Sequence, residues 1–337
     1  MHVTTVGLDL AKHVFQVHGI DQDGQVLIRR QLRRGELINF FRRLPPCLIG
    51  MEACSTAHFW ARELAVLGHE VRLMPAAYVK PYIKRGKSDV LDAAGICEAV
   101  TRPTMRFVAI KTKEQQAVLV MHRTRELLVR QRTQTINALR GLLGEFGICE
   151  PQGIWHLGRL RAHLEDDTVP EPGRKVLSLL VEQLNEVEKR IAQVEAEIRA
   201  WHRSNPVSQR LARIPGIGSL TASAIAATVP DASLFRSGRE FDAWLGLVPR
   251  QKSTGGKQRL GRITHQGDAY IRRLLIIGAQ SALQRSKEVR ENAWVQRLLG
   301  RCARLKVAVA LANKTARIAW ALMRTGDIYR RAAVSAA

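Results

Sequence analysis

The sequence has none of the features of a zinc-ribbon, secreted or membrane-spanning protein. Its five cysteines include no C-x-x-C pair and are odd in number, a pattern that fits a reducing cytosol and argues against a zinc ribbon. No apolar run approaches the length that spans a membrane. The first twenty residues contain Asp9, Lys12 and His13, so we expect no signal peptide. We therefore expect a soluble, intracellular protein with no membrane partner.

Acidic residues are scarce relative to basic ones. The chain holds 30 Asp and Glu against 53 Lys and Arg, which gives a net charge of +23 and a pI of about 10.8. This charge exceeds what solubility requires and predicts a polyanionic partner, with nucleic acid ahead of an acidic membrane surface. With 337 residues and 46% hydrophobic content, the chain can bury a sizeable core divided over two or three domains.

The N-terminal part has the pattern of an α/β domain. Residues 3–9, 13–18 and 25–32 read as strands, and the turn at 21–24 joins the last two as a hairpin. The elements expected after them are a helix at 36–44, a strand at 47–51, a helix at 57–67 and a strand at 70–74. Three hairpin-type strands followed by alternating helices and strands predict a mixed sheet with helices packed on it, an order that resembles the ribonuclease H-like fold.

Four carboxylates fall where such a sheet would gather them. Asp9 ends the first strand, Glu52 follows an apolar strand, and Asp89 and Asp92 open a later helix with their side chains on one face. Strand ends at one edge of a sheet share a crevice. Four carboxylates there could hold two Mg²⁺ ions for phosphoryl transfer. The alternative is that Asp9 and Glu52 cap neighbouring elements, while the aspartate pair forms a solvated helix face or suits the helix dipole.

The middle of the chain predicts long helices. Residues 113–146 lack turn residues and read as one extended helix. A second segment has apolar residues at steps of three and four, which is the seam of a coiled coil with a largely acidic flank. We expect this seam to pair with the 113–146 helix of the same chain and with another subunit. The seam residues are Leu177, Leu180, Leu184, Val187, Ile191, Val194, Ile198 and Trp201.

The C-terminal part holds two glycine-rich segments. The turn at 215–218 precedes a small-residue helix at 219–228, as in helix-hairpin-helix motifs that offer N-H groups to phosphate; a tight turn between packed helices is the alternative. The stretch 249–262 has hydroxyls, glycines and five cations but no acid. Ser253 in it could attack phosphorus once a metal or a base activates its hydroxyl. The alternative for this stretch is a simple phosphate-binding loop.

Arginine and lysine gather at places where a nucleic-acid backbone could bind, although a solvated surface is the alternative. The candidate nucleic-acid contacts are Arg29, Arg30, Arg33, Arg34, Arg250, Lys252, Lys257, Arg259, Arg262, Arg272 and Arg273.

Five motifs occur together in this order: GLDLAK at 7–12, MEAC at 51–54, KSDVLDA at 87–93, PGIG at 215–218 and STGGK at 253–257. On these motifs the chain resembles the DEDD insertion-sequence transposases, whose N-terminal domain is similar to the RuvC Holliday-junction nuclease. The resemblance runs over nearly the whole length. It implies a RuvC-like domain at 1–110, long helices with a coiled coil at 111–205 and an all-α transposase domain at 206–337.

The resemblance also implies roles. Asp9, Glu52, Asp89 and Asp92 would bind Mg²⁺, and Ser253 would be the nucleophile that cuts and rejoins DNA, with Thr254 standing where many relatives carry a second serine. The family implies a noncoding guide RNA encoded by the element, a homo-oligomer (dimer or tetramer) whose active sites combine acid and serine domains, and a place at the nucleoid in the bacterial cytoplasm. A RuvC-like nuclease that uses metal-activated water and a noncatalytic nucleic-acid-binding protein are the alternatives.

Overall fold

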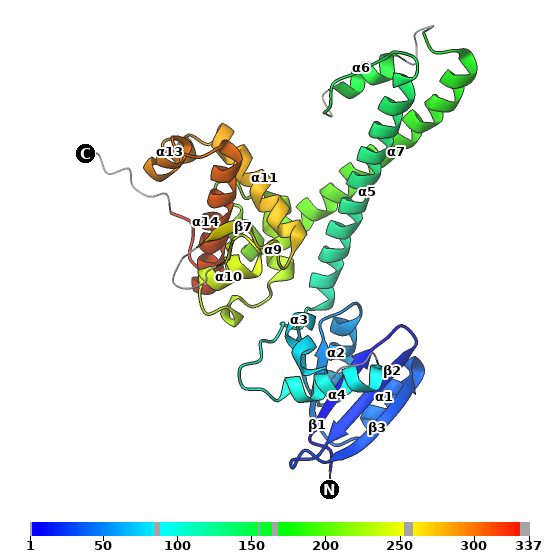
Figure 1. Ribbon diagram of the computed structural model, residues 1–337, viewed down its shortest axis with the longest axis vertical. Coiled ribbons are helices and arrows are strands. Elements are labelled where there is room, and N and C mark those ends of the chain that lie inside the picture. Colours follow the sequence, from blue (N-terminus) through cyan, green and yellow to red (C-terminus); the bar gives the residue numbers. More distant parts are fainter. Residues whose placement is uncertain (1, 84–87, 154–155, 164–167, 253–258, 331–337) are drawn as a thin grey trace. The chain divides into compact units, whose positions relative to one another are not determined.

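The computed structural model (Figure 1) describes residues 2–83, 88–153, 156–163, 168–252 and 259–330. The chain forms two compact units. Unit 1 comprises Met1–Gln115 and Val229–Arg236, and unit 2 comprises Gln116–Thr228 and Ser237–Ala337. The long helices expected at 111–205 and the helices after them thus fall largely within one unit. The division into three domains stays a prediction.

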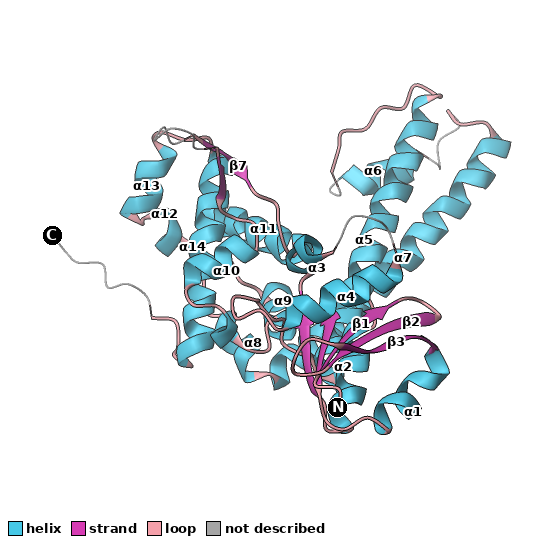
Figure 2. Ribbon diagram, turned by 60° about the horizontal axis from the view of Figure 1, so that its bottom comes forward, coloured by secondary structure: helices cyan, strands magenta, loops and turns pink. Residues whose placement is uncertain are grey.

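Unit 1 is built on a five-stranded mixed sheet with the order β3-β2-β1-β4-β5 (Figure 2). β2 pairs antiparallel with β1 and β3, whereas β4 pairs parallel with β1 and β5. The strands are β1 (Thr5–Leu10), β2 (Val14–Ile20), β3 (Val26–Arg33), β4 (Leu48–Glu52) and β5 (Glu70–Met74). The mixed sheet expected from the sequence is confirmed, and its order is consistent with a ribonuclease H-like fold.

Helices pack on both faces of this sheet. On one face, α1 and α2 bury Phe41 and Trp60 against strand residues such as Leu8 and Phe15. On the other face lies α4, whose Ile96 and other apolar residues form a second core. The helical elements of unit 1 are η1 (Arg34–Glu36), α1 (Leu37–Arg42), α2 (Ala57–Val66), α3 (Ala76–Val79), η2 (Lys80–Tyr82), α4 (Asp89–Val100) and η4 (Ala232–Leu234).

Two strand glycines let α4 lie directly on the sheet. A Cβ atom on Gly7 of β1 would lie 2.1 Å from the carbonyl oxygen of Ala93 and 2.5 Å from the backbone nitrogen of Cys97. A Cβ atom on Gly50 of β4 would lie 2.7 Å from Cβ of Val100. Glycine inside a strand often marks such a close approach. The distance of α4 from the sheet is therefore set by the absence of two side chains.

Unit 2 contains two long helices that pack against each other in antiparallel orientation. Leu128 clusters with Val187 and Ile191, whereas Leu143 clusters with Leu177. The helices are α5 (Lys113–Gly144) and α7 (Glu171–Ser204). The apolar seam of α7 thus packs on the helix of its own chain, as expected, while pairing with another subunit stays a prediction.

A buried histidine ties α5 to the helices that follow. His122 is 2% exposed, and its Nδ1 lies 3.0 Å from the hydroxyl of Tyr270 and its Nε2 3.1 Å from that of Ser223. Burial, together with the charge of Arg125, lowers the pKa of His122 to about 4. The imidazole is therefore neutral at physiological pH and can donate to one hydroxyl while accepting from the other.

The other regular elements in the described part of unit 2 are helices and one hairpin. The sequence predicted a loop at 249–262, but β6 and β7 pair there, with 253–258 outside the described residues. The remaining elements are α6 (Leu157–Ala162), α8 (Pro206–Leu211), α9 (Ser219–Thr228), α10 (Gly238–Trp244), β6 (Pro249–Gln251), β7 (Leu260–Ile263), α11 (Ala269–Arg285), α12 (Lys287–Arg290), α13 (Ala293–Leu299) and α14 (Arg304–Thr325). Among the described residues, no helix combines the length and apolarity needed to cross a membrane.

The substitution Gly7→Ala should destabilise the protein, because the added methyl group would meet the backbone of α4. We expect a loss of about 1 to 3 kcal/mol in the free energy of unfolding, measured by urea denaturation. Gly35→Ala is the matched control, because a Cβ atom there meets nothing within 4 Å. Equal stability of the two variants would contradict the contact between α4 and β1.

Candidate functional site

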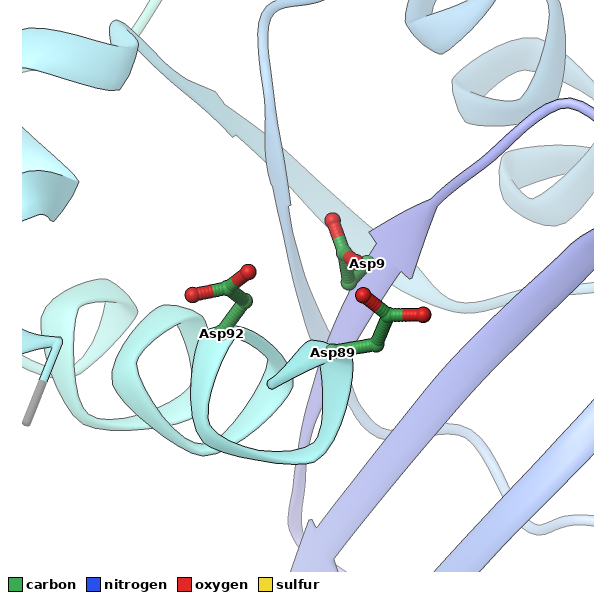
Figure 3. Close-up of side chains that lie close together, drawn as sticks. All are labelled: Asp9, Asp89 and Asp92. Carbon is green, nitrogen blue, oxygen red and sulfur yellow. The ribbon is translucent and has the colours of Figure 1, made fainter. Parts of the chain in front are cut away.

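Three aspartates from two elements meet at the edge of the sheet (Figure 3). Asp9 lies at the end of β1 and on the same face as Gly7, because alternate residues of a strand share a face. Asp89 and Asp92 lie in the first turn of α4. Each carboxylate places an oxygen within 4.8 Å of an oxygen of the other two. The contact between α4 and β1 thus brings the three acids together.

Glu52 lies beside this group but outside it. It is the last residue of β4, which runs parallel to β1, and it shares the α4 face with Gly50. Its carboxylate is not among those that lie within 4.8 Å of one another in the described part of the chain. Its charge still acts on the site, because it contributes to raising the pKa of Asp9.

The acids repel one another. Burial and the charges of Asp92, Asp89 and Glu52 raise the pKa of Asp9 from 3.8 to about 6. Burial and the charge of Asp92 also raise the pKa of Glu52. Three converging carboxylates that offer only oxygen atoms are the donors that a hard cation such as Mg²⁺ prefers, and a cation would remove the repulsion. The residues present therefore fit a divalent metal.

The N-terminus of α4 suits this arrangement. Ser88, which precedes the helix, is extended, and its carbonyl oxygen accepts the first helical hydrogen bonds, from the backbone nitrogens of Leu91 and Asp92. Negative charge in the first turn of a helix is favourable because the helix dipole is positive there. The dipole offsets part of the repulsion between the aspartates.

Two features of the site were not predicted from the sequence. The first is the close approach at Gly7 and Gly50, although glycine inside an apolar strand is a signal of it. The second is Cys54, whose thiol pKa is raised by burial and by the charges of Glu52 and Asp9. Its position two residues after Glu52 was the signal that could have placed it here.

The arginines of β3 divide between the two faces of the sheet. Leu32 is in the core with α1 and α2, so Arg29 and Arg33 lie on the opposite face, the face that carries Asp9. Arg30 lies on the α1 side, 5.7 Å from the ring centre of Phe40. Arg34, which follows the strand, lies 5.0 Å from the ring of Trp60. All four arginines are exposed.

The structure describes only some of the candidate residues of unit 2. Ser253, Thr254 and Lys257 lie outside the described residues. The cations of the hairpin are exposed: Arg250, Lys252, Arg259 and Arg262.

Arg272, which the sequence placed among the nucleic-acid contacts, has a buried side chain. This residue is 8% exposed, and its guanidinium donates to two backbone carbonyls. Arg273, the next residue, is exposed and pairs with Glu126 at 2.8 Å.

The glycine turn at 215–218 packs against a helix. Gly216 has a φ of +88°, and a Cβ atom there would lie 2.8 Å from the carbonyl oxygen of Gly278 in α11. The turn also lines a cavity of about 780 Å³ together with Arg130 and Arg273. Packing accounts for Gly216, and phosphate contact by the turn stays a prediction.

Asp9→Asn should change how stability depends on pH in the presence of EDTA. The pKa of Asp9 in the folded protein, about 6, lies above its ordinary value of 3.8, so folding favours the neutral acid. The wild-type protein therefore loses stability as the pH rises from about 4 through 6. At pH 7.5 the variant should be more stable by about 1 kcal/mol, a figure discounted because the site is partly exposed. Urea denaturation at pH 4.5 and 7.5 measures this difference.

With Mg²⁺ in place of EDTA, the wild-type protein should become more stable than Asp9→Asn. Mg²⁺ stabilises the wild-type carboxylates, whereas the variant offers it fewer ligands. Asp23→Asn, on the exposed turn between β2 and β3, should follow the wild-type protein under both conditions. A wild-type advantage over Asp9→Asn at pH 7.5 in EDTA would refute the repulsion.

Two family models that match this chain and two of its relatives are described as transposases. A model described as the transposase IS116/IS110/IS902 family matches residues 208–294, and a DEDD-type model described as transposase matches residues 6–148. A probable family 20 transposase of Pseudomonas aeruginosa is 50% identical over 336 residues, covering 98% of this chain and 99% of that protein. The transposase for insertion sequence element IS1328 of Yersinia enterocolitica is 40% identical over 332 residues, covering 98% and 99%. The chain therefore belongs to the IS110/IS116 family of insertion-sequence transposases, enzymes that cut and rejoin DNA.

Proposed function

We propose that Asp9, Asp89 and Asp92, with Glu52 beside them, hold Mg²⁺ for DNA cleavage and rejoining by this transposase. The observation that carries the proposal is the convergence of three carboxylates within 4.8 Å. When bound, the metal would supply positive charge that stabilises the attacking and leaving oxygens at phosphorus. The raised pKa of Asp9 supports the proposal, because burial and the neighbouring carboxylates both disfavour its charged form and a bound cation would favour that form.

We also propose that Ser253 is the nucleophile. Its Oγ forms a bond to a DNA phosphorus while the bond from phosphorus to the 3′ oxygen breaks; the serine loses its proton and the 3′ oxygen gains one. The product is a DNA 5′ phosphate esterified to the serine and a free 3′ hydroxyl, and the reverse reaction rejoins DNA. The STGGK motif shared with the family supports this role. The exposed cations of the adjoining strands, Arg250 and Arg262 among them, suit phosphate oxygens.

Ser253→Ala should abolish the covalent protein-DNA product, whereas Thr254→Ala should retain it. The substrate is labelled duplex DNA from the ends of the element, and the product is resolved on denaturing gels. Asp92→Asn should also abolish the product, while Asp23→Asn should form it at the wild-type rate. An adduct formed by Ser253→Ala would refute the serine role, and cut DNA without any adduct in the wild-type protein would favour a nuclease that uses water.

The resemblance supports two further parts of the proposal. The chain acts as a homo-oligomer at the nucleoid, and a noncoding RNA encoded by the element guides it to DNA; the net charge of +23 suits two nucleic-acid partners. A discrete RNA that copurifies with active protein supports guidance, and full activity without RNA contradicts it. Mixing Asp92→Asn with Ser253→Ala restores activity only if one chain's serine acts with another chain's acids.

Arg29 and Arg33 should contact the DNA backbone, because they share the sheet face that carries Asp9. The logarithm of the association constant for DNA falls as the logarithm of the salt concentration rises. Replacing both arginines by glutamine should make this slope less steep by about 2. Replacing Arg30 and Arg34, which cover rings on the other side of the sheet, should change the slope less. Fluorescence anisotropy at several salt concentrations measures both slopes, and equal changes would contradict the assignment to one face.

A further inference from the structure

Arg272 is a buried cation held by backbone carbonyls. It lies in the first turn of α11 and is 8% exposed. Burying a guanidinium is unfavourable unless its N-H groups are paired. Its Nη1 donates to the carbonyl oxygen of Leu245 at 2.8 Å and to that of Gln266 at 2.5 Å. Bonds from a charged donor are stronger than neutral ones, so the two carbonyls are firmly joined.

The two carbonyls belong to the two stems of the β6-β7 hairpin. Leu245 precedes β6, and Gln266 follows β7. A Cβ atom on Gly246 would lie 2.4 Å from the carbonyl oxygen of Gln266, and one on Gly267 would lie 1.8 Å from that of Trp244. Both glycines have positive φ, +70° and +65°. The backbones of the two stems are therefore in contact, and Arg272 bridges them at this contact.

The described strands of the hairpin are short and contribute little to the core. β6 and β7 are three and four residues long, and seven residues in all are exposed or half-buried. A two-stranded hairpin of this size is marginal in water. At the base, the backbone nitrogens of Thr264 and His265 donate to the carbonyl oxygens of Val248 at 2.9 Å and Gly246 at 3.3 Å, and near the other end that of Lys252 donates to Arg259 at 2.9 Å. The side-chain amide of Asn313 in α14 also donates to the carbonyl oxygen of Leu247 at 3.4 Å, so the hairpin is attached to the helices at its base. The base of the hairpin thus sets the direction of its strands.

We infer that Arg272 is a positioning residue that clamps both stems and so orients the hairpin cations toward DNA. The cations concerned are Arg250, Lys252, Arg259 and Arg262. The inference rests on the proposed function, because the clamp affects the reaction only if the hairpin contacts DNA at the reacting phosphate. Arg272 itself touches no substrate, since its guanidinium is buried on the two carbonyls.

The test compares Arg272→Met with the control Arg285→Met. Methionine keeps an apolar stem but loses both hydrogen bonds, while Arg285 is the exposed last residue of the same helix. Hydrogen exchange at the amides of Thr264 and His265 should accelerate at least about tenfold in Arg272→Met. The rate of adduct formation at saturating DNA should fall about tenfold to a hundredfold, as expected for a misplaced contact. The Kd for DNA should stay within about threefold, because the surface cations remain. Arg285→Met should match the wild-type protein in all three measurements.

The outcomes separate this inference from the proposed function. If Arg272→Met has the same amide hydrogen exchange and the same rate of adduct formation as the wild-type protein, the clamp is refuted. If the wild-type protein forms no adduct, the proposed function fails, while the exchange measurement still decides whether the clamp exists. Arg272→Lys keeps the charge without the planar fork, and it should fall between the wild-type protein and Arg272→Met. If Arg272→Met does not fold, Arg272→Lys provides the test. The clamp is refuted if this variant has the hydrogen exchange and the rate of adduct formation of the wild-type protein.

Discussion

The contact between the backbones of α4 and β1 determines where the acids lie. Gly7 has no Cβ atom to separate the helix from the strand, and a methyl group there would overlap Ala93. Asp9 follows Gly7 by two residues on the same face, and Asp89 precedes Ala93 by one helical turn. The convergence of the carboxylates is therefore a product of packing in the middle of the helix, and not of any attraction between the acids themselves.

Much of unit 1 could be predicted from the sequence, because local pattern and topology agree there. Apolar alternation located the strands, and an acid at a strand end was enough to place Asp9 at the sheet edge. Pattern does not give the distance between Glu52 and the other acids, since this depends on how β4 and α4 sit on β1. The pKa of Asp9 was likewise inaccessible, because it depends on burial and on charges brought together by folding.

Unit 2 shows where sequence pattern fails. A lack of turn residues marked one long helix and a heptad seam marked the other, but the strands of the hairpin are short and polar, so no alternation marked them. Arg272 and Arg273 look alike in the sequence, yet Arg272 is buried between the two hairpin stems, whereas Arg273 pairs with Glu126 at the surface. Their difference depends on contacts with residues distant in sequence. The same holds for His122, which joins three helices through two hydroxyls.

The contact between the two stems separates residues that hold the hairpin in place from residues that can be substituted at little cost. Gly246, Gly267 and Arg272 hold the stems, and none of them belongs to the strands. The strand residues Pro249–Gln251 and Leu260–Ile263 carry little of the core. We therefore expect mutations in the strands to cost little stability and mutations at the contact between the stems to cost more. If the hairpin contacts DNA as proposed, this arrangement would let an insertion element alter that contact over evolutionary time without changing the helices that support the hairpin.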